Sequence, residues 1–381
     1  MDHLSQRSGM PRASTQPSRG EPVGHSRRGW LAGVMFLAAL VAAMAATVGA
    51  PGPTEASASP GSETTATAAT VGDDPCPGAL QVVDEATERG RPAMCTHGAD
   101  PGVTPEDLAA QHAVGPEATA GIQCYGDGTS GARVQLIYAH PDNVNRFAAF
   151  RRAIKRRAAQ IDAIYDASAQ QTGGHRHVRW ATSPSCNINV QSVLIPAAAI
   201  PTSGIETLID SLERQGFSSN DRKYLVWVDT NTSRTAPVAT CLGLGTIYRD
   251  DTDTAANLNN RFGGYTRVDE KCLLAIFDPV AAHVEAHELM HTLGAVQSDA
   301  PNATREGHCT DEYDIMCYAD APGTATRRVC SGRASEMRLD CNHDDYFSTN
   351  PTRGGYLDTH WNSADSRWLE SVPGYRTSTP R

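Results

Sequence analysis

The sequence predicts an α/β domain in which strands and helices alternate along the chain. Short apolar runs typical of buried strands alternate along the chain with longer segments whose apolar residues recur at helical spacing. The 381 residues are 40% hydrophobic and include 33 glycines and 23 prolines, as expected of a globular protein. No internal repeat interrupts this order, so a single α/β domain over residues 126–381 is expected.

The first 50 residues are predicted to direct export. A basic flank ending at Arg27-Arg28 precedes a continuous apolar run from Trp30 to Val48, which is typical of a signal peptide. The run is also long enough to span a bilayer, so a single-pass membrane anchor with the following domain outside is the alternative. Residues 51–72 are rich in Ala, Ser, Thr and Pro and are predicted to be a linker. We therefore expect a secreted, extracellular protein.

Charge and cysteine content narrow the class of protein. The formal net charge of -10 argues against a nucleic-acid partner. Ten cysteines, none in a Cys-x-x-Cys pair, indicate disulfides behind a secretion signal. Residues 73–125 form a short N-terminal extension; if it is a propeptide, Cys95 or His97 could block a metal. The even cysteine count favours a Cys76–Cys95 disulfide instead.

The elements of the main domain follow from hydrophobic spacing. Strands are predicted over 134–139, 177–181, 188–195, 224–229 and 272–277, and helices over 145–169, 203–215 and 361–371. Residues 230–270 are expected to be mainly loop. Their aspartates, Asp250, Asp251 and Asp253, could bind calcium, but a hydrated loop is the favoured interpretation.

A further helix is expected to begin at Asp278-Pro279 and to carry the chemistry. It contains His287-Glu288-x-x-His291. Residues four apart lie on one helix face, so both imidazoles could bind one zinc ion. Glu288 is not expected to bind the metal; it would act as the general base on a zinc-activated water.

A catalytic zinc usually has three protein ligands, so the motif needs a partner. Gly294 can end the helix and turn the chain back towards the metal. The stretch resembles the metzincin zinc proteases, whose pattern is H-E-x-x-H-x-x-G-x-x-H, except that Gln297 occupies the last position. In the leishmanolysin branch an insertion delays the third histidine, and His308 would match it. Asp311 and Gln297 remain alternatives, but imidazole suits zinc best.

The resemblance extends to Asp314-Ile315-Met316-Cys317-Tyr318, which is similar to a metzincin methionine turn. It implies that Met316 lies beneath the ligands and that Tyr318 reaches the metal or the developing oxyanion. Burial in the core is the alternative for both. Disulfides are expected for Cys309–Cys317, Cys330–Cys341, Cys241–Cys272 and Cys124–Cys186. The carboxylates of residues 338–347 could also bind calcium, but a capped polar turn is the favoured interpretation. The resemblance implies a twisted mixed sheet with two long backing helices, an active-site helix and a small C-terminal subdomain.

These features predict a monomeric, secreted, zinc-dependent endopeptidase that hydrolyses protein or peptide substrates. Zinc is the expected cofactor, with calcium as a candidate second ion. A membrane would be a partner only if the N-terminal apolar segment stays uncleaved. Two alternatives remain: a zinc-stabilised binding protein whose site is closed by a fourth ligand, and a cell-wall peptide hydrolase.

Overall fold

The computed structural model describes residues 74–76, 79–98, 122–200, 204–230, 242–270, 272, 278–304, 306–320, 323–330, 335 and 337–371. The predicted signal or anchor (1–50) and linker (51–72) lie outside these residues. Within the described part of the chain, no helix combines the length and the apolarity that crossing a membrane would require.

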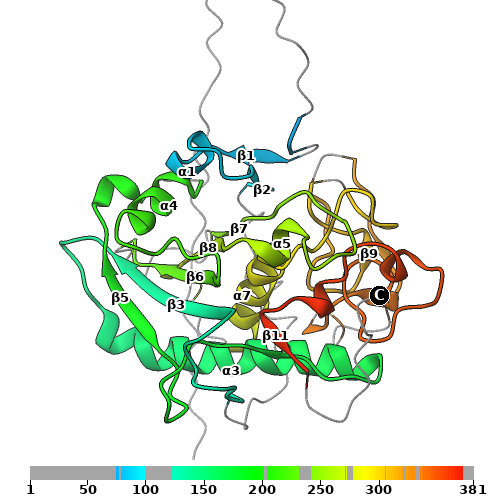
Figure 1. Ribbon diagram of the computed structural model, residues 1–381, viewed down its shortest axis with the longest axis horizontal. Helices are drawn as coiled ribbons and strands as arrows, with labels where there is room; N and C mark the ends of the chain where they lie inside the picture. Colours follow the sequence, from blue (N-terminus) through cyan, green and yellow to red (C-terminus); the bar gives the residue numbers. More distant parts are fainter. Residues whose placement is uncertain are drawn as a thin grey trace, which may run out of the picture. The chain divides into compact units, whose positions relative to one another are not determined.

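A five-stranded mixed sheet forms the centre of the domain (Figure 1). Its strand order is β5 (Val190–Leu194), β3 (Arg133–His140), β6 (Arg222–Val228), β8 (Gly264–Asp269) and β7 (Gly243–Gly245). The first four strands run parallel and β7 runs antiparallel to β8. The α/β fold class and the mixed sheet predicted from the sequence are therefore confirmed.

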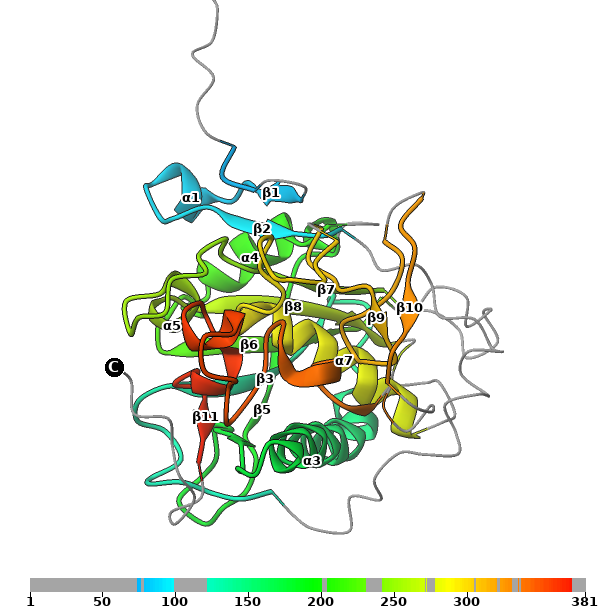
Figure 2. The same ribbon diagram turned by 90° about the vertical axis from the view of Figure 1, so that its right-hand side faces the viewer.

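The two faces of the sheet bury different side chains because successive strand residues point to opposite sides. Leu136 and Trp227 point into a core shared with α3 (Phe147–Gln171) and α7 (Asp278–Thr292). Ile137 and Val226 point the other way, into a core shared with α4 (Glu206–Glu213). Figure 2 shows α3 and α4 on opposite sides of the sheet.

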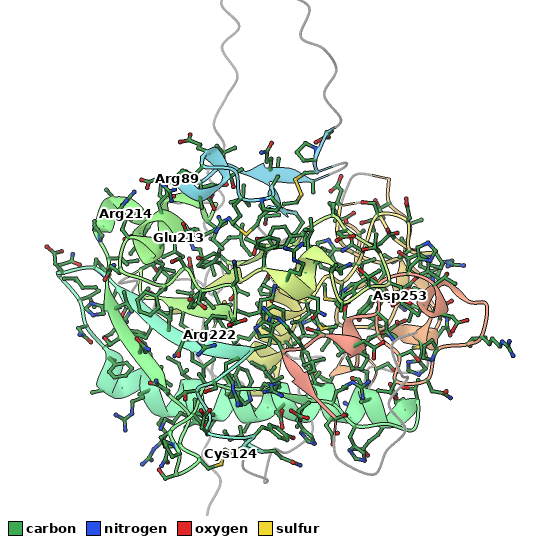
Figure 3. The ribbon with its side chains drawn as sticks, in the orientation of Figure 1. Arg89, Cys124, Glu213, Arg214, Arg222 and Asp253 are labelled. Atoms are coloured by element: carbon green, nitrogen blue, oxygen red, sulfur yellow. A yellow bond between two sulfur atoms is a disulfide. The ribbon has the colours of Figure 1, made fainter. Side chains whose placement is uncertain are left out.

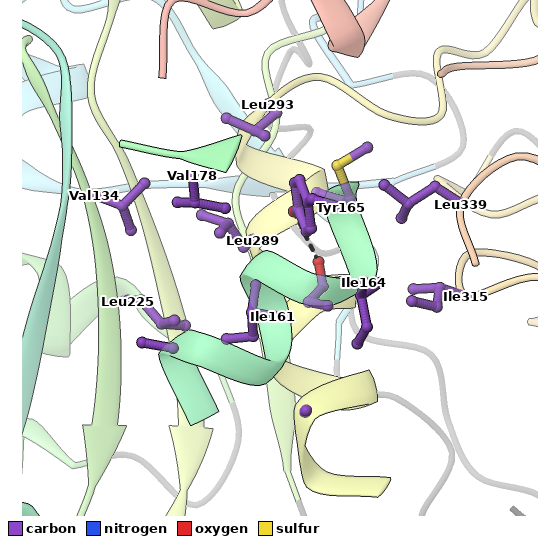
Figure 4. Close-up of a cluster of buried hydrophobic side chains, with 14 of the residues drawn as sticks. Val134, Ile161, Ile164, Tyr165, Val178, Leu225, Leu289, Leu293, Ile315 and Leu339 are labelled. Atoms are coloured by element: carbon purple, nitrogen blue, oxygen red, sulfur yellow. Dashed lines mark hydrogen bonds between the residues drawn. The ribbon is translucent and has the colours of Figure 1, made fainter. Parts of the chain in front are cut away.

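Helix α3 fixes the position of α7, which carries the metal-binding motif. Ile154, Ile161 and Tyr165 recur at helical spacing and are fully buried. Figure 4 shows Ile161 and Tyr165 in this core. The Tyr165 hydroxyl donates to the carbonyl of Ala286 in α7 at 3.2 Å. Burial of each such apolar side chain contributes about 1.5–3 kcal/mol relative to exposure, so packing of α3 in the core that it shares with α7 helps to hold α7 in place.

The remaining elements are short. They are β1 (Leu80–Val82), α1 (Glu85–Glu88), β2 (Met94–Thr96), β4 (His177–Val178), α5 (Leu258–Arg261), β9 (Asp311–Glu312), β10 (Arg327–Arg328), β11 (Leu369–Glu370) and four 3₁₀ turns at Ala197–Ala199, Cys341–His343, Tyr356–Asp358 and Ser363–Asp365. β1 pairs with β2, β9 with β10, and β4 with β11.

Several predicted elements differ from the structure. The helix expected over 361–371 is wrong: Asn362 caps a single 3₁₀ turn through the Ala364 amide, and the chain then extends into β11. Residues 230–270 contain β7, β8 and α5 where loop was expected, because β8 buries polar residues such as Arg267, which Asp269 pairs. Cys272 is helical, and residues 273–277 of the predicted strand lie outside the described residues.

The two predicted backing helices are of unequal length and do not back the same face. The first has 25 residues, whereas α4 has only eight and ends before Gly216. Four predicted disulfides are confirmed: Cys76–Cys95, Cys124–Cys186, Cys309–Cys317 and Cys330–Cys341. The predicted partner of Cys272, Cys241, lies outside the described residues.

Candidate metal centre

Helix α7 presents His287 and His291 on one face, as their spacing of four residues requires. Their Nε2 atoms lie 2.9 Å apart and both side chains are buried. Glu288 is also fully buried. Strand β7 passes directly over it, and a Cβ atom added to Gly243 would lie 2.1 Å from Glu288 Oε1. Glycine in β7 therefore allows the edge strand to approach the motif closely.

His308 joins this pair from a loop. Its Nε2 lies 3.2 Å from Nε2 of His287. The Cys309–Cys317 disulfide ties the loop to the following turn, and the Thr304 amide donates to the His308 carbonyl at 2.8 Å. Tetrahedral zinc with Zn–N bonds of ~2.0–2.1 Å would separate its nitrogen ligands by about 3.3 Å, which is close to these spacings.

The opposite ring nitrogen of each histidine has an oxygen partner. Nδ1 of His287 lies 2.8 Å from the Ile315 carbonyl, and Nδ1 of His291 lies 3.2 Å from that of Ala295. Nδ1 of His308 lies 3.1 Å from a carboxylate oxygen of Asp320. Donation from Nδ1–H leaves the lone pair of Nε2 facing the centre, which is the usual arrangement around metal-bound histidine.

Burial favours the neutral form of the His291 and His308 rings, which is the form that binds metal. It lowers the pKa of His291 and of His308 well below the ordinary value, and the neighbouring His97 and His287 lower both further. Neutral imidazoles whose lone pairs converge repel one another. A divalent cation at their centre would remove that repulsion, so the donor set fits zinc.

The two alternative third ligands lie elsewhere. The Gln297 amide donates to the carbonyls of Tyr248 and Gly294, each at 3.0 Å. Asp311 groups with Asp344 and Asp345, apart from the histidines. Gly294 has φ +94°, so the expected left-handed end of the helix is present.

Of the two residues expected in a methionine turn, Met316 lies in the core and Tyr318 lies beside His308. Met316 is fully buried in the core that α7 shares. The Tyr318 hydroxyl lies 2.7 Å from Nε2 of His308, with ring centroids 4.1 Å apart. Asp314 supports the turn by accepting from the Met316 and Cys341 amides at 2.6 and 2.7 Å.

A fourth histidine comes from the N-terminal extension. His97 belongs to one group with His287, His291 and His308, whose potential ligand atoms all lie within 4.8 Å of one another. Its ring centroid lies 4.4 Å from that of His291 and 4.6 Å from that of His308. Its Nε2 lies 3.7 Å from a Glu288 carboxylate oxygen. The Cys76–Cys95 disulfide thus coexists with a histidine at the site.

Three further contributors were not found from the sequence. Asp320 orients His308, Gly243 makes room for Glu288, and Arg249 lies near His291, with its pKa lowered by burial to about 10. Arg249 donates to the Val296 carbonyl at 2.9 Å. No local motif marks them; only the spacing of two glycines in Gly243-Leu244-Gly245 hints at a close approach.

Carboxylates of both candidate calcium sites accept hydrogen bonds from nearby backbone amides. The Asp250 carboxylate accepts from the amides of Thr252 and Leu258 at 3.1 and 2.7 Å, which closes a local loop. Asp340 accepts from the amides of Tyr346 and Phe347 at 2.8 and 2.5 Å. Asp340 thus caps a polar turn.

The sequence matches no protein-family model and shows no significant similarity to a curated protein. Among solved structures, three of OgpA from Akkermansia muciniphila align with TM-scores of 0.31, 0.31 and 0.29 at 15%, 13% and 13% identity. Two are wild-type crystal forms, and the third is a catalytically inactive form in complex with an O-glycopeptide substrate, glycodrosocin. Each alignment covers 47% of this chain and 52% of OgpA, so this chain spans about half of that protein.

Proposed function

We propose that this protein is a secreted, zinc-dependent endopeptidase of the metzincin type. The observation that carries the proposal is the convergence of three buried imidazole nitrogens, with Nε2 spacings of 2.9 and 3.2 Å, beside a buried glutamate. His287, His291 and His308 would hold the metal. When bound there, zinc would polarise the scissile carbonyl and lower the pKa of water.

The other groups would move protons and stabilise charge. Glu288 follows His287 on the helix, so its carboxylate can take a proton from the attacking water and return it to the leaving amine. The Tyr318 hydroxyl would donate to the oxyanion that develops on the scissile carbonyl. Burial of Glu288 excludes competing solvent, which strengthens these interactions.

Protein or peptide chains are the proposed substrates, outside the cytoplasm. The four described disulfides support an oxidising compartment. The domain boundaries proposed from the sequence are kept, with the peptidase domain over 126–381. Calcium remains a candidate second ion at the carboxylates around Asp311 and Asp345.

One observation favours a second candidate, a zinc-stabilised binding protein without catalysis. Structural zinc sites are closed by four protein ligands, whereas catalytic sites keep one position open. His97 supplies a fourth imidazole at this site. Glu288 favours the peptidase, because a purely structural four-histidine site has no use for a buried carboxylate beside it.

The test measures hydrolysis of casein and of quenched fluorescent peptides, with and without a chelator. It uses the zinc-loaded intact chain and its His97→Ala variant, each with and without Glu288→Gln. We expect chelator-sensitive hydrolysis by His97→Ala, and its loss by at least about 10²–10⁴-fold in the Glu288→Gln form with zinc content unchanged. Retained hydrolysis in the Glu288→Gln form would sink the mechanism. No hydrolysis by any form would favour the binding protein.

A further inference from the structure

The described start of the N-terminal extension, residues 74–76 and 79–98, has several features that fix its shape. β1 and β2 pair antiparallel, and the Cys76–Cys95 disulfide joins the start of the segment to β2. Between the strands, Asp84 caps α1 by accepting from the Thr87 amide at 2.7 Å. Cys76 and Cys95 pair with each other, so no described disulfide joins residues 74–98 to the rest of the chain.

The extension docks on the sheet face that α4 covers. Val82 and Met94 are fully buried in one core with Leu244 and Tyr248. Leu244 lies in the edge strand β7, and Tyr248 follows three residues after its end. This burial resembles a small protein interface with apolar anchors at its centre.

Charged side chains surround these anchors. Arg91 pairs with Asp84 and with Glu213, and Arg214 lies 2.9 Å from Glu85. Figure 3 shows Arg89 of the extension close to Glu213 and Arg214 at the end of α4. Anchors and ion pairs together fix one orientation of the extension.

The end of β2 adds to the edge of the sheet next to the metal centre. Cys95 and Ile247 exchange both backbone hydrogen bonds, at 2.7 and 2.9 Å, as an antiparallel bridge. Ile247 lies two residues beyond β7, the strand that covers Glu288. This bridge brings the chain to the centre just before His97.

His97 then enters the centre itself. Its side chain is 3% exposed, and the side chain of Glu288, 3.7 Å away, is fully buried. We infer that His97 is a removable fourth metal ligand and that the extension holds the enzyme in a latent, closed form. This inference rests on the proposed function. His97 would fill the position that water needs and would contact the general base, so neither water nor substrate could enter.

Two features favour a removable ligand over a permanent one. The extension brings its own disulfide, its own hairpin and its own cap, so it can leave as a unit without unfolding the sheet. In the closed form the Glu288 carboxylate contacts His97. Once His97 has left, the same carboxylate can act as the general base.

The test replaces zinc with cobalt(II) and titrates the intact chain, His97→Ala and a control, His360→Ala, with acetohydroxamate. His360 stacks on Tyr356 and does not belong to the metal group. Cobalt absorption reports coordination without requiring turnover. We expect the His97→Ala spectrum to change at hydroxamate concentrations at least tenfold below those needed for the intact chain and for His360→Ala. A second variant, Arg91→Ala, keeps His97 but weakens docking and should respond in between.

Equal responses of the intact chain and His97→Ala would overturn the inference and leave the proposed function standing. Peptide hydrolysis is measured in parallel, and His97→Ala should exceed the intact chain by at least tenfold. A cobalt spectrum that opens in His97→Ala without any hydrolysis would support the closed centre while refuting the peptidase. Failure of cobalt to bind any form would overturn both.

Discussion

The candidate metal centre is assembled from two regions of the chain that are held in place in different ways. Helix α7 supplies His287 and His291 from the middle of the core, and backbone carbonyls orient both rings. The loop after Gly294 supplies His308, which a side-chain carboxylate orients and a disulfide restrains. The helix half depends on packing, whereas the loop half depends on a few specific polar groups.

This difference separates the effects that mutations should have. A backbone carbonyl cannot be removed by substitution, so the helix ligands can be disturbed only by replacing them or by loosening α7. The loop ligand can be disturbed through Asp320 or through the carboxylates behind it. The following predictions use that contrast, from the largest expected effect to the smallest.

Removing a helix ligand or the loop ligand should have the largest effect, and both should lower zinc affinity to a similar extent. In the His97→Ala background, His291→Ala and His308→Ala should each lower zinc affinity on the order of 10³-fold, because total zinc binding energies of ~10–16 kcal/mol are shared among few ligands. Competition with a fluorescent chelator measures this. Gln297→Ala and Asp311→Ala are the matched controls; loss of zinc only in Asp311→Ala would show that His308 is the wrong third ligand.

Loosening α7 should change stability more than metal binding. Trp227 Nε1 donates to Glu285 at 2.6 Å, and Arg157 lies 3.8 Å from the same buried carboxylate. Glu285→Ala removes this carboxylate from the buried Arg157 charge, and we expect a loss of about 3–5 kcal/mol in the free energy of unfolding. Denaturant unfolding of the metal-free protein measures it. A loss below about 1 kcal/mol would show that packing alone holds the helix.

Disturbing the orientation of His308, the loop ligand, should change metal binding more than stability. Asp320→Ala removes the partner of His308 Nδ1, and we expect zinc affinity to fall by about 10–100-fold with little change in stability. Asp320 also accepts a hydrogen bond from the Thr304 hydroxyl. Thr304→Val therefore serves as a control that removes this bond and keeps the carboxylate. If Thr304→Val matches Asp320→Ala, Asp320 acts on the loop and not on the imidazole.

The carboxylates behind the loop should give the smallest effect, a pH dependence. Burial, with the nearby Asp345 and Asp314, raises the pKa of Asp311 from 3.8 to about 8, and burial raises that of Asp314 to about 7. The folded state therefore binds these protons more tightly than the unfolded state. Their stabilising contribution is complete below about pH 4 and is lost as the pH rises towards 8.

With a calcium chelator present, Tm should therefore fall between pH 5 and pH 8, and Asp311→Asn should reduce the fall by about 2–4 °C, or ~1 kcal/mol. Differential scanning calorimetry at both pH values measures this. Asp250→Asn, in another loop, should leave the fall unchanged. An equal fall in Asp311→Asn would show that these carboxylates do not control it.

The same contrast explains what the sequence could predict. Helical periodicity alone brings His287 and His291 together, and short apolar runs identify β3 and β6. The loop half depends on long-range contacts, such as Asp320 with His308, that no local pattern encodes. Strand β8 was missed because its buried Thr266 and Arg267 do not follow the apolar rule. The sequence predicts His97 only as one residue of a propeptide that could block the metal. It lies 190 residues from His287, and no local spacing relates the two.

The covalent link between His97 and the rest of the chain has a consequence for pharmacology. A ligand fixed to the same chain competes at an effective concentration that dilution cannot lower. An inhibitor of the open centre would bind the intact chain with its Kd divided by the open fraction, so an open fraction of about 1% would weaken it by roughly 100-fold. Compounds ranked on the intact chain would then be ranked mainly by how well they displace a histidine.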